Sequence, residues 1–397
     1  MKREDLVDLF ALTAKVLEDN REDVISWLCN IETLNMARLE LDKTLRALTT
    51  FEREVIYLDQ RQPLGKVGVM LPFNTPLYGL VLYAFGPVFS GNKVLVKPSS
   101  LSFDIIDSVF NLLATNGILE EMPISLHKPG KWFLEDLCLK EEKVDAVSFT
   151  GQWGSVASVL SLIPQDVRFI YSGSGYNPFI VLESANLESA AEIAVDSRLW
   201  NSGQDCLAAE RFYVHRSVFD DFVKILIEKL TRIKCGTNLE NNVRVGPLIN
   251  GDHVAYLRGL IKSNLSESKV LYEGIFSDNL ITPFVIETAH NSPLLLSEKY
   301  GPIFTLAKFD SSSEVIEQAN GIDFALGATV CGEGEKVIDK LDFAHVAYEN
   351  SILTIEDDDA HRPFGGYKNS GFVFCKSENY QVSGPILYSV ETSVEAQ

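Results

Sequence analysis

VGVMLPFNTPLYGLVLYAFGPVFSGNKVLV, residues 67–96, begins and ends with short apolar runs and has a longer apolar segment between them. The valine-rich runs at 67–71 and 94–96 are typical of buried strands. Residues 77–89 are long enough for a buried helix. Strand, helix and strand in this order predict a parallel sheet with helices on its faces.

The same stretch has no charged residue from 67 to 92, so it is long enough to cross a bilayer. Asn74 and three prolines interrupt it, and a single membrane helix could not keep its backbone hydrogen-bonded past them. We therefore interpret it as a strand, a loop and a helix in a protein core. Residues 1–10 are charged and lack the apolar segment of a signal peptide, which favours a cytoplasmic protein.

The alternation continues outward from this unit. Residues 1–59 carry apolar positions at helical spacing and predict helices. Further strands are expected at 145–149, 168–171, 179–182, 211–214, 303–307 and 328–331, and further helices at 102–114, 155–162, 187–200, 218–233 and 336–343. The glycine-rich turn 172–177 separates two such blocks. The pattern predicts an α/β protein with two domains, 1–172 and 173–371, and a C-terminal tail, 372–397.

Composition excludes several classes of function. The chain has 397 residues, of which 46% are hydrophobic and 23% charged, as in globular proteins. Its 35 basic and 55 acidic residues give a net charge of −20, which disfavours binding to nucleic acid or to anionic membranes. The six cysteines form no CxxC pair, which fits a reducing compartment. The six histidines are scattered, so we expect no metal site.

Local sequence strings go further than composition. Seven strings occur in a characteristic order: LPFNTP (71–76), GNKVLVKPSS (91–100), SFTG (148–151), NSGQDCLAAERFYV (201–214), GPLI (246–249), EKYGPIF (298–304) and PFGGYKNSG (363–371). Together they resemble the aldehyde dehydrogenase superfamily over about residues 3–372. The resemblance implies two Rossmann-like domains, with cofactor binding in 1–172, catalysis in 173–371, and a tail that returns to the cofactor domain or the oligomer interface. It also implies NAD or NADP as cofactor, a small-molecule aldehyde as substrate and a homo-dimer or higher homo-oligomer with small oligomerisation elements.

Two residues match the family's reacting groups. Cys206 stands at the position of the nucleophile, and a thiolate readily adds to an aldehyde. Asn74 stands at the position whose amide, with the backbone N–H of Cys206, stabilises the oxyanion. The alternative for Asn74 is a cap on the helix that begins near Leu77. The other five cysteines fit small buried core residues better.

Further residues match the family's cofactor and substrate positions. By resemblance, Lys97 holds the adenine-ribose hydroxyls and Glu298 holds the nicotinamide ribose. Ser100 replaces a glutamate that is common in NAD-specific members, which removes repulsion against a 2′-phosphate and favours NADP as well as NAD; alternatively, it caps a helix before Phe103. The remaining cofactor-side candidates are Phe73, Gly151 and Tyr300. Trp200 and Phe364 are candidates for an aromatic substrate channel, although such aromatics also fit a plain core.

The main departure from the family pattern is at residues 171–178, YSGSGYNP. Hydrolytic members carry Glu-Leu-Gly-Gly here, and that glutamate is the general base for the deacylating water. In register this chain has Ser172, which cannot replace a carboxylate as base at neutral pH. The turn is similar to the Gly-x-Gly-Asn-x-Pro-like turn of members that transfer the acyl group to coenzyme A. Release to water, release to coenzyme A, and a catalytically impaired homologue that binds a nucleotide or a partner all stay open.

Two other departures and one charged run stand out. Gln152 and Trp153 replace smaller residues and would crowd the pyrophosphate. The family's N-terminal arm is shortened, as is the oligomerisation hairpin, here about 50–62. The acidic run 356–359 lies near the family's substrate entrance, where it would attract a cationic aldehyde or form a solvated loop.

Overall fold

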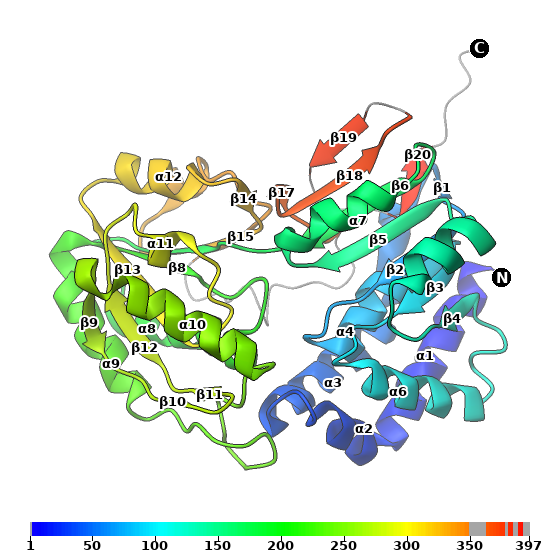
Figure 1. Cartoon of the computed structure of the whole chain (residues 1–397), viewed down its shortest axis with the longest axis horizontal. Coiled ribbons are helices and arrows are strands. Elements are labelled where there is room, and N and C mark those ends of the chain that lie inside the picture. Colours follow the sequence, from blue (N-terminus) through cyan, green and yellow to red (C-terminus); the bar gives the residue numbers. More distant parts are fainter. Residues whose placement is uncertain (1, 349–362, 378–379, 384–387, 392–397) are drawn as a thin grey trace.

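The structure is a computed structural model that describes residues 2–348, 363–377, 380–383 and 388–391. Within these residues the chain forms two seven-stranded sheets, one in each half of the molecule (Figure 1). Most neighbouring strands in both sheets run parallel, and helices cover their faces. The α/β class expected from the strand–helix alternation is confirmed. The acidic run 356–359 lies outside the described residues.

The first sheet has the strand order β19-β18-β6-β5-β2-β3-β4. Strands β6, β5, β2, β3 and β4 are parallel, and β18 and β19 are antiparallel additions at one edge. The bounds are β2 (Lys66–Met70), β3 (Lys93–Lys97), β4 (Ile124–Leu126), β5 (Ala146–Gly151), β6 (Arg168–Gly173), β18 (Gly371–Cys375) and β19 (Tyr380–Ser383). The strands of the 67–96 unit are β2 and β3, side by side as expected.

Helices cover both faces of this sheet because its central strands are apolar on both sides. One face packs on α1 (Arg3–Asp19), α2 (Arg21–Leu28), α3 (Leu34–Leu48), the continuous segment α4 (Pro76–Leu80), η2 (Val81–Phe85) and α5 (Gly86–Phe89), and α6 (Phe103–Thr115). The other face packs on η3 (Phe133–Glu141) and α7 (Val156–Leu162). The uncharged stretch is thus a strand, a loop and a buried helix. No helix in the described part of the chain is long and apolar enough to span a membrane.

The second sheet has the order β16-β15-β7-β8-β13-β12-β9, and only β9 runs antiparallel to its neighbour. Its strands are β7 (Pro178–Val181), β8 (Arg211–His215), β9 (Lys269–Tyr272), β12 (Phe284–Glu287), β13 (Ile303–Phe309), β15 (Gly327–Cys331) and β16 (His345–Tyr348). Its main helices are α8 (Leu187–Leu199), α9 (Phe219–Leu230), α10 (Gly251–Asn264) and α12 (Ser312–Asn320). The elements between 234 and 300 did not stand out in the sequence.

Short elements complete the fold. They are η1 (Phe51–Tyr57), β1 (Arg61–Pro63), η4 (Trp153–Ser155), η5 (Trp200–Gly203), η6 (Arg216–Val218), η7 (Leu265–Glu267), β10 (Phe276–Ser277), β11 (Leu280–Ile281), α11 (Pro293–Leu296), β14 (Phe324–Ala325), α13 (Glu335–Ile338), β17 (Tyr367–Lys368) and β20 (Ser389–Glu391). The shortened hairpin expected at 50–62 is absent: this segment is η1 followed by β1, and β1 pairs with β20 from the other end of the chain.

The chain changes sheets between Gly173, the last residue of β6, and Pro178, the first residue of β7. It returns to the first sheet at β18, which pairs with β6.

The helix expected at 336–343 is shorter than predicted. After Asp339 the backbone bonds run from each residue to the third one before it, as in Lys340 N–H to Val337 O and Leu341 N–H to Ile338 O, so the α-helix does not continue.

Candidate active site

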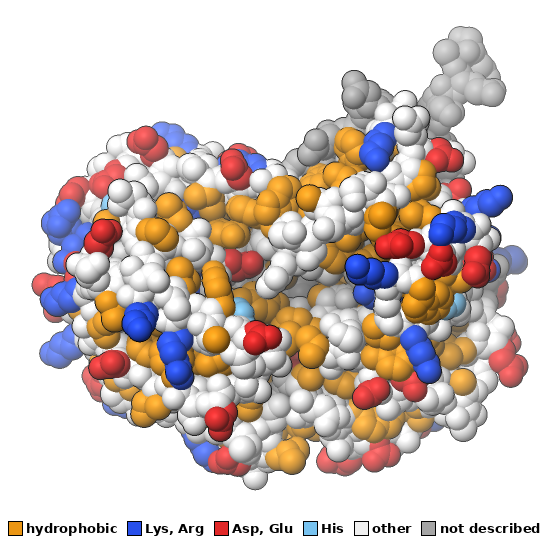
Figure 2. Space-filling model, in the orientation of Figure 1, with side chains coloured by type: hydrophobic (Ala, Val, Ile, Leu, Met, Phe, Trp, Pro, Cys, Tyr) orange, Lys and Arg blue, Asp and Glu red, His pale blue; other side chains and the backbone are white. Residues whose placement is uncertain are grey.

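A cavity of about 1050 Å³ lies where the two sheets face each other. All ten residues selected from the sequence line it: Phe73, Asn74, Lys97, Ser100, Gly151, Trp200, Cys206, Glu298, Tyr300 and Phe364. Figure 2 shows the surface hollowed between the two halves of the molecule, with hydrophobic side chains around the hollow. Residues that are far apart in sequence therefore meet in one place.

Strand ends place these side chains. Asn74 follows β2, Lys97 ends β3 and Gly151 ends β5, so all three lie at the carboxyl edge of the first sheet. Ligands bind at this edge in open α/β sheets. Cys206 and Glu298 instead precede β8 and β13, at the amino ends of parallel strands. The cavity thus lies between a carboxyl edge and an amino edge.

A strained turn carries the candidate nucleophile. Asn201, Ser202 and Gly203 all have positive φ angles, of 44°, 60° and 84°. For a residue with a side chain this conformation costs roughly 1–3 kcal/mol and persists only when surrounding contacts hold it. Gly203 is required here because a Cβ would lie 2.6 Å from the carbonyl group of Gly301. The turn and the loop at 298–302 are therefore packed together.

Side chains of the turn also fix it to the GPLI segment. Ser202 Oγ accepts a hydrogen bond from the Gly246 N–H at 2.9 Å, and Gln204 Oε1 accepts one from the Ile249 N–H at 2.8 Å. Both acceptors are buried, so losing either bond would leave a donor unsatisfied. These contacts bring the strings around 201 and 246 together at the site.

The glycine-rich turn at 172–177 packs against the loop that carries the nucleophile. Asn177 Nδ2 donates to the carbonyl oxygens of Cys206, at 2.7 Å, and Ala208, at 2.9 Å, while its Oδ1 accepts from the Gly327 N–H at 2.9 Å. A Cβ at Gly175 would overlap the Cys206 carbonyl oxygen. Gly175 and Asn177 therefore fix the distance between the Cys206 loop and the turn: the glycine allows the close contact, and the asparagine hydrogen-bonds to the loop.

Asn74 faces the cavity and does not cap the following helix. It is 8% exposed, and its amide has no hydrogen-bond partner among the described residues. The helix that starts at Pro76 is capped by Glu40 of α3, whose Oε1 accepts the N–H groups of Leu77 at 2.7 Å and Tyr78 at 2.8 Å. The capping alternative for Asn74 is wrong because a carboxylate already satisfies these donors, which leaves the amide available to a ligand.

A second buried glutamate strengthens this support. Glu32 Oε1 accepts the Thr75 N–H at 3.3 Å, and the carboxyls of Glu32 and Glu40 hydrogen-bond to each other. Burial and the charge of Glu40 raise the pKa of Glu32 well above its usual range. Burial thus favours the neutral form of Glu32, and its contact with the Thr75 N–H holds the backbone next to Asn74. Sequence reasoning missed this pair because both residues read as ordinary helix acids.

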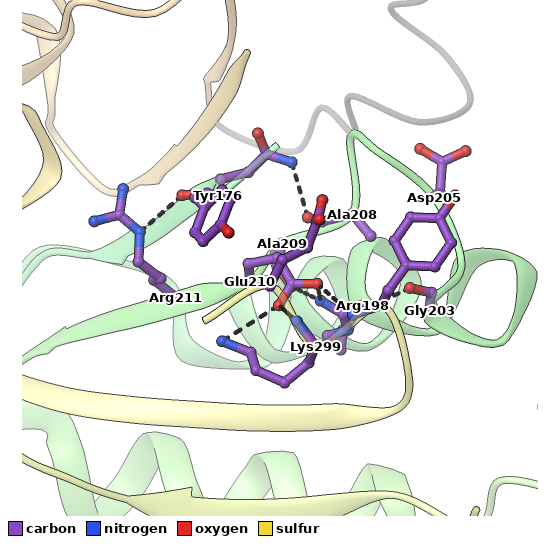
Figure 3. Close-up of polar contacts among 12 residues, drawn as sticks. Tyr176, Arg198, Gly203, Asp205, Ala208, Ala209, Glu210, Arg211 and Lys299 are labelled. Atoms are coloured by element: carbon purple, nitrogen blue, oxygen red, sulfur yellow. Dashed lines mark hydrogen bonds and ion pairs between the residues drawn. The ribbon is translucent and has the colours of Figure 1, made fainter. Parts of the chain in front are cut away.

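A buried ion cluster joins the nucleophile loop to the Glu298 loop (Figure 3). Glu210 lies between Arg198, at 2.6 Å, and Lys299, at 3.3 Å, and all three side chains are at most 1% exposed. Arg198 also donates to the carbonyls of Gly203 and Ala209, at 2.7 and 2.6 Å. Burial opposes the charge of Glu210, but the two cations keep its pKa below its usual range.

Glu210 also positions the loop before β13 directly. Its carboxylate accepts the backbone N–H groups of Lys299, at 2.9 Å, and Tyr300, at 3.0 Å. Tyr300 has a φ of 50°, so this loop too is strained and needs such contacts. The residue therefore holds two site loops at once, which the sequence string AERF did not reveal.

We predict that Glu210→Gln lowers the free energy of unfolding by about 3–5 kcal/mol, because two buried cations lose their counter-charge. Urea denaturation at neutral pH measures the change. Asp310→Asn is the matched control, since its partner Arg216 is exposed, and it should change the free energy far less. Equal effects in both variants would contradict the role of the cluster.

Glu298 lines the cavity at the start of this loop. The Ser174 hydroxyl and the Gly175 N–H hydrogen-bond to its carboxyl group. Burial, followed by the charge of Glu210, raises the pKa of Glu298 to about 8. A carboxyl group with this pKa takes up or releases a proton near neutral pH, which is the range useful for acid–base chemistry.

Aromatic rings and one histidine line the cavity around Glu298. The rings of Tyr300 and Phe73 meet edge to face at 6.1 Å. His253 Nε2 donates to the Tyr300 carbonyl at 2.9 Å, and burial lowers the pKa of this imidazole. Trp200 is 3% exposed and Phe364 is half-buried. His253 was not selected from the sequence, where it stood in no motif.

The residues at the carboxyl edge of the first sheet fit a nicotinamide dinucleotide. Lys97 is half-buried and has no hydrogen-bond or ion-pair partner among the described residues, and burial lowers its pKa. An ammonium group without a protein partner can donate hydrogen bonds to the sugar hydroxyls or to a phosphate of such a cofactor. Ser100 is exposed on the same wall and does not cap the helix, since Ser102 is at the cap position of α6.

Trp153 does not crowd this wall, and the expectation that it would is wrong. Its ring turns away and packs against Tyr171, Phe324 and Phe372 at 5.8, 5.9 and 6.4 Å. Gln152 is exposed and lines the cavity. The bulky residue thus joins an aromatic cluster at the sheet edge and leaves the cavity free.

Ser172 stands where the resemblance places a glutamate. It is 4% exposed, its hydroxyl has no hydrogen-bond partner among the described residues, and it is absent from the cavity lining, to which its neighbours Gly173 and Ser174 contribute. A serine at this point supplies no base to the cavity.

Known proteins share both the sequence pattern and the fold. The aldehyde dehydrogenase family model matches residues 1–382. A lactaldehyde dehydrogenase of Methanococcus maripaludis is 29% identical over 374 residues, covering 85% of this chain and 76% of the relative. A betaine aldehyde dehydrogenase of Bacillus subtilis is 27% identical, covering 93% and 77%.

A solved structure supports the same assignment for the fold. The glyceraldehyde-3-phosphate dehydrogenase GapN of Methanocaldococcus jannaschii, complexed with NADP, superimposes with a TM-score of 0.84 at 21% identity, covering 96% of this chain and 89% of that one. The match of the family model to nearly the whole chain is decisive: the chain belongs to the aldehyde dehydrogenase family of oxidoreductases.

Proposed function

We propose that this protein oxidises an aldehyde with NAD or NADP through a thioester on Cys206. The single observation that carries the proposal is the convergence of Cys206, Asn74, Lys97 and Glu298 on one cavity between the sheets. The two relatives cited act, by their names, on different aldehydes, so we propose the reaction class rather than one substrate. Residues 1–172 and the strands after 371 would hold the cofactor, and 173–371 would carry the nucleophile.

The chain's own groups account for the first half of the reaction. Cys206, as thiolate, adds to the aldehyde carbon, and the carbonyl oxygen takes up the negative charge. The Asn74 amide and the Cys206 N–H donate to this oxygen. Lys97 and Ser100 hold ribose hydroxyls or a 2′-phosphate, and Glu298 holds the second ribose. A nicotinamide held there would supply the hydride acceptor that the conversion of the adduct to a thioester needs.

The second half releases the acyl group. Ser172 provides no base, and the turn with Gly175 and Asn177 is similar to the turn of acyl-transferring members described above. We propose release to water as the basal route, with coenzyme A as an alternative acceptor. A thioester can pass to a thiol without a carboxylate at position 172, so the same acyl-enzyme serves both routes.

An absorbance assay tests this function. The protein is mixed with a panel of short aliphatic and aromatic aldehydes and with NAD or NADP, with and without coenzyme A. We expect a burst of one NAD(P)H per chain, followed by turnover, and NADP is accepted alongside NAD. Acceleration of turnover by coenzyme A, with acyl-coenzyme A as product, supports the transfer route. The complete absence of a burst would support the impaired, binding-only homologue instead.

A further inference from the structure

The cavity needs a base for water-dependent release, and few groups are available. Among the described residues, four carboxyl groups line it: Glu40, Glu135, Asp205 and Glu298. Ser172 stands where the resemblance places the family's base. If an acyl group on Cys206 is to leave to water, a carboxylate or the His253 imidazole of the lining has to accept the proton. The His253 ring already hydrogen-bonds through Nε2 to the Tyr300 carbonyl, so we compare the four carboxylates.

Three of the four are poorly placed. Glu40 already accepts two backbone N–H groups at the start of α4. Glu135 lies on η3, which packs on the opposite face of the first sheet from α4. Asp205 folds back on its own loop, where its Oδ1 accepts the Leu207 N–H at 2.7 Å. Glu298 is the remaining candidate.

One residue links Glu298 to the nucleophile. The N–H of Gly175 hydrogen-bonds to the Glu298 carboxyl, and the same glycine lies so close to the Cys206 carbonyl oxygen that a Cβ would overlap it. A single residue therefore separates the carboxyl from the nucleophile loop. The Ser174 hydroxyl is a second hydrogen-bond partner of the carboxyl. These contacts tie the Glu298 carboxyl to the turn that packs against the Cys206 loop, on the wall of the cavity that Cys206 also lines.

We propose that Glu298, besides holding the cofactor ribose, is the general base that activates the deacylating water. Water attacks the acyl carbon of the Cys206 thioester, and its proton passes to the Glu298 carboxylate. The carbon–sulfur bond then breaks, Cys206 leaves as thiolate and the acyl group leaves as a carboxylic acid. Glu298 returns its proton to solvent. The inference rests on the proposed function of Cys206.

The surroundings of Glu298 give this role a pH signature. A base works only when deprotonated, and the pKa of Glu298 is raised to about 8, chiefly by burial and next by Glu210. Deacylation should therefore accelerate as the pH rises through about 8 and level off above it. The other titratable and charged groups that act on Glu298 or respond to its charge are Arg198, Tyr171, Tyr176, Tyr256 and Tyr300.

An ester substrate separates this role from cofactor binding. p-Nitrophenyl acetate acylates Cys206 without any nicotinamide, so the burst of nitrophenolate reports attack and the steady state reports deacylation. We expect Glu298→Gln to keep the burst rate and amplitude and to slow the steady state on the order of 10²–10⁴-fold. The wild-type steady state should rise through about pH 8, and that of Glu298→Gln should not. Glu298→Asp, which retains a carboxylate, should recover part of the rate.

Each outcome decides the proposal. A normal steady state in Glu298→Gln overturns it, and so does a greater loss in Asp205→Asn, which removes the competing carboxylate. Loss of the burst itself in Glu298→Gln would mean that the residue only shapes the Cys206 loop, which also overturns it. Absence of a burst in the wild type would refute the assignment of Cys206, and the proposal would fall with it.

Discussion

Replacing Cys206 by alanine is expected to abolish NAD(P)H formation with every aldehyde, a loss on the order of 10⁴-fold or more. Every step that we propose passes through a bond to this sulfur, and no neighbouring side chain substitutes for it. Stopped-flow absorbance at saturating aldehyde and cofactor measures both the burst and the steady state, and both should disappear.

Cys235→Ala is the matched control for this experiment. Cys235 is also half-buried, but it lies in the second half of the molecule outside the cavity lining. This variant should keep the wild-type burst. If Cys206→Ala still reduced NAD(P) at the wild-type rate, the nucleophile would have to be another group and the mechanism would be wrong.

Replacing Asn74 by alanine is expected to slow the attack step strongly while leaving the fold intact. Removing one oxyanion donor from such a site costs on the order of 10²–10³-fold in rate, because the donor meets the charge only as it develops. The loss should appear in the burst rate with aldehyde and in the acylation rate with p-nitrophenyl acetate. Cofactor affinity, measured by fluorescence titration, should change little.

The stability of Asn74→Ala separates this role from a structural one. Glu40 caps the following helix, so the free energy of unfolding should stay close to that of the wild type. Asn111→Ala on the exposed face of α6 serves as the control for activity. A strongly destabilised Asn74→Ala variant with a normal burst rate would show that the amide supports the loop and not the oxyanion.

Local patterns predicted much of the fold. The unit at 67–96 was predictable because buried parallel strands are short and apolar and the helix between them is longer. The segment 234–300 was not, since β9 is half exposed and β10 and β11 have two residues each. Such elements are set by what they pack against rather than by their own periodicity.

The residues that line the candidate site could be predicted from the sequence, but the buried residues that hold its loops in place could not. The ten selected positions line one cavity, and nine of them stand in strings with a recognisable order, while Trp200 directly precedes one. Glu210, its two cations and the Glu32–Glu40 pair were missed, since a buried charge network becomes visible only when distant segments meet. The sequence could not decide whether Asn74 and Ser100 cap helices. Capping depends on which residue lies within hydrogen-bond distance of the first N–H groups of a helix, and only the structure shows this.

The most direct measurement of the central claim is the mass of the protein during turnover. The enzyme is mixed with an aldehyde and NADP without coenzyme A, quenched in acid and analysed intact and after proteolysis. We predict an added mass equal to the acyl group, located on the peptide that contains Cys206 and matched by one equivalent of NADPH. NADPH formed with no adduct, or with the adduct on another residue, would contradict the thioester mechanism.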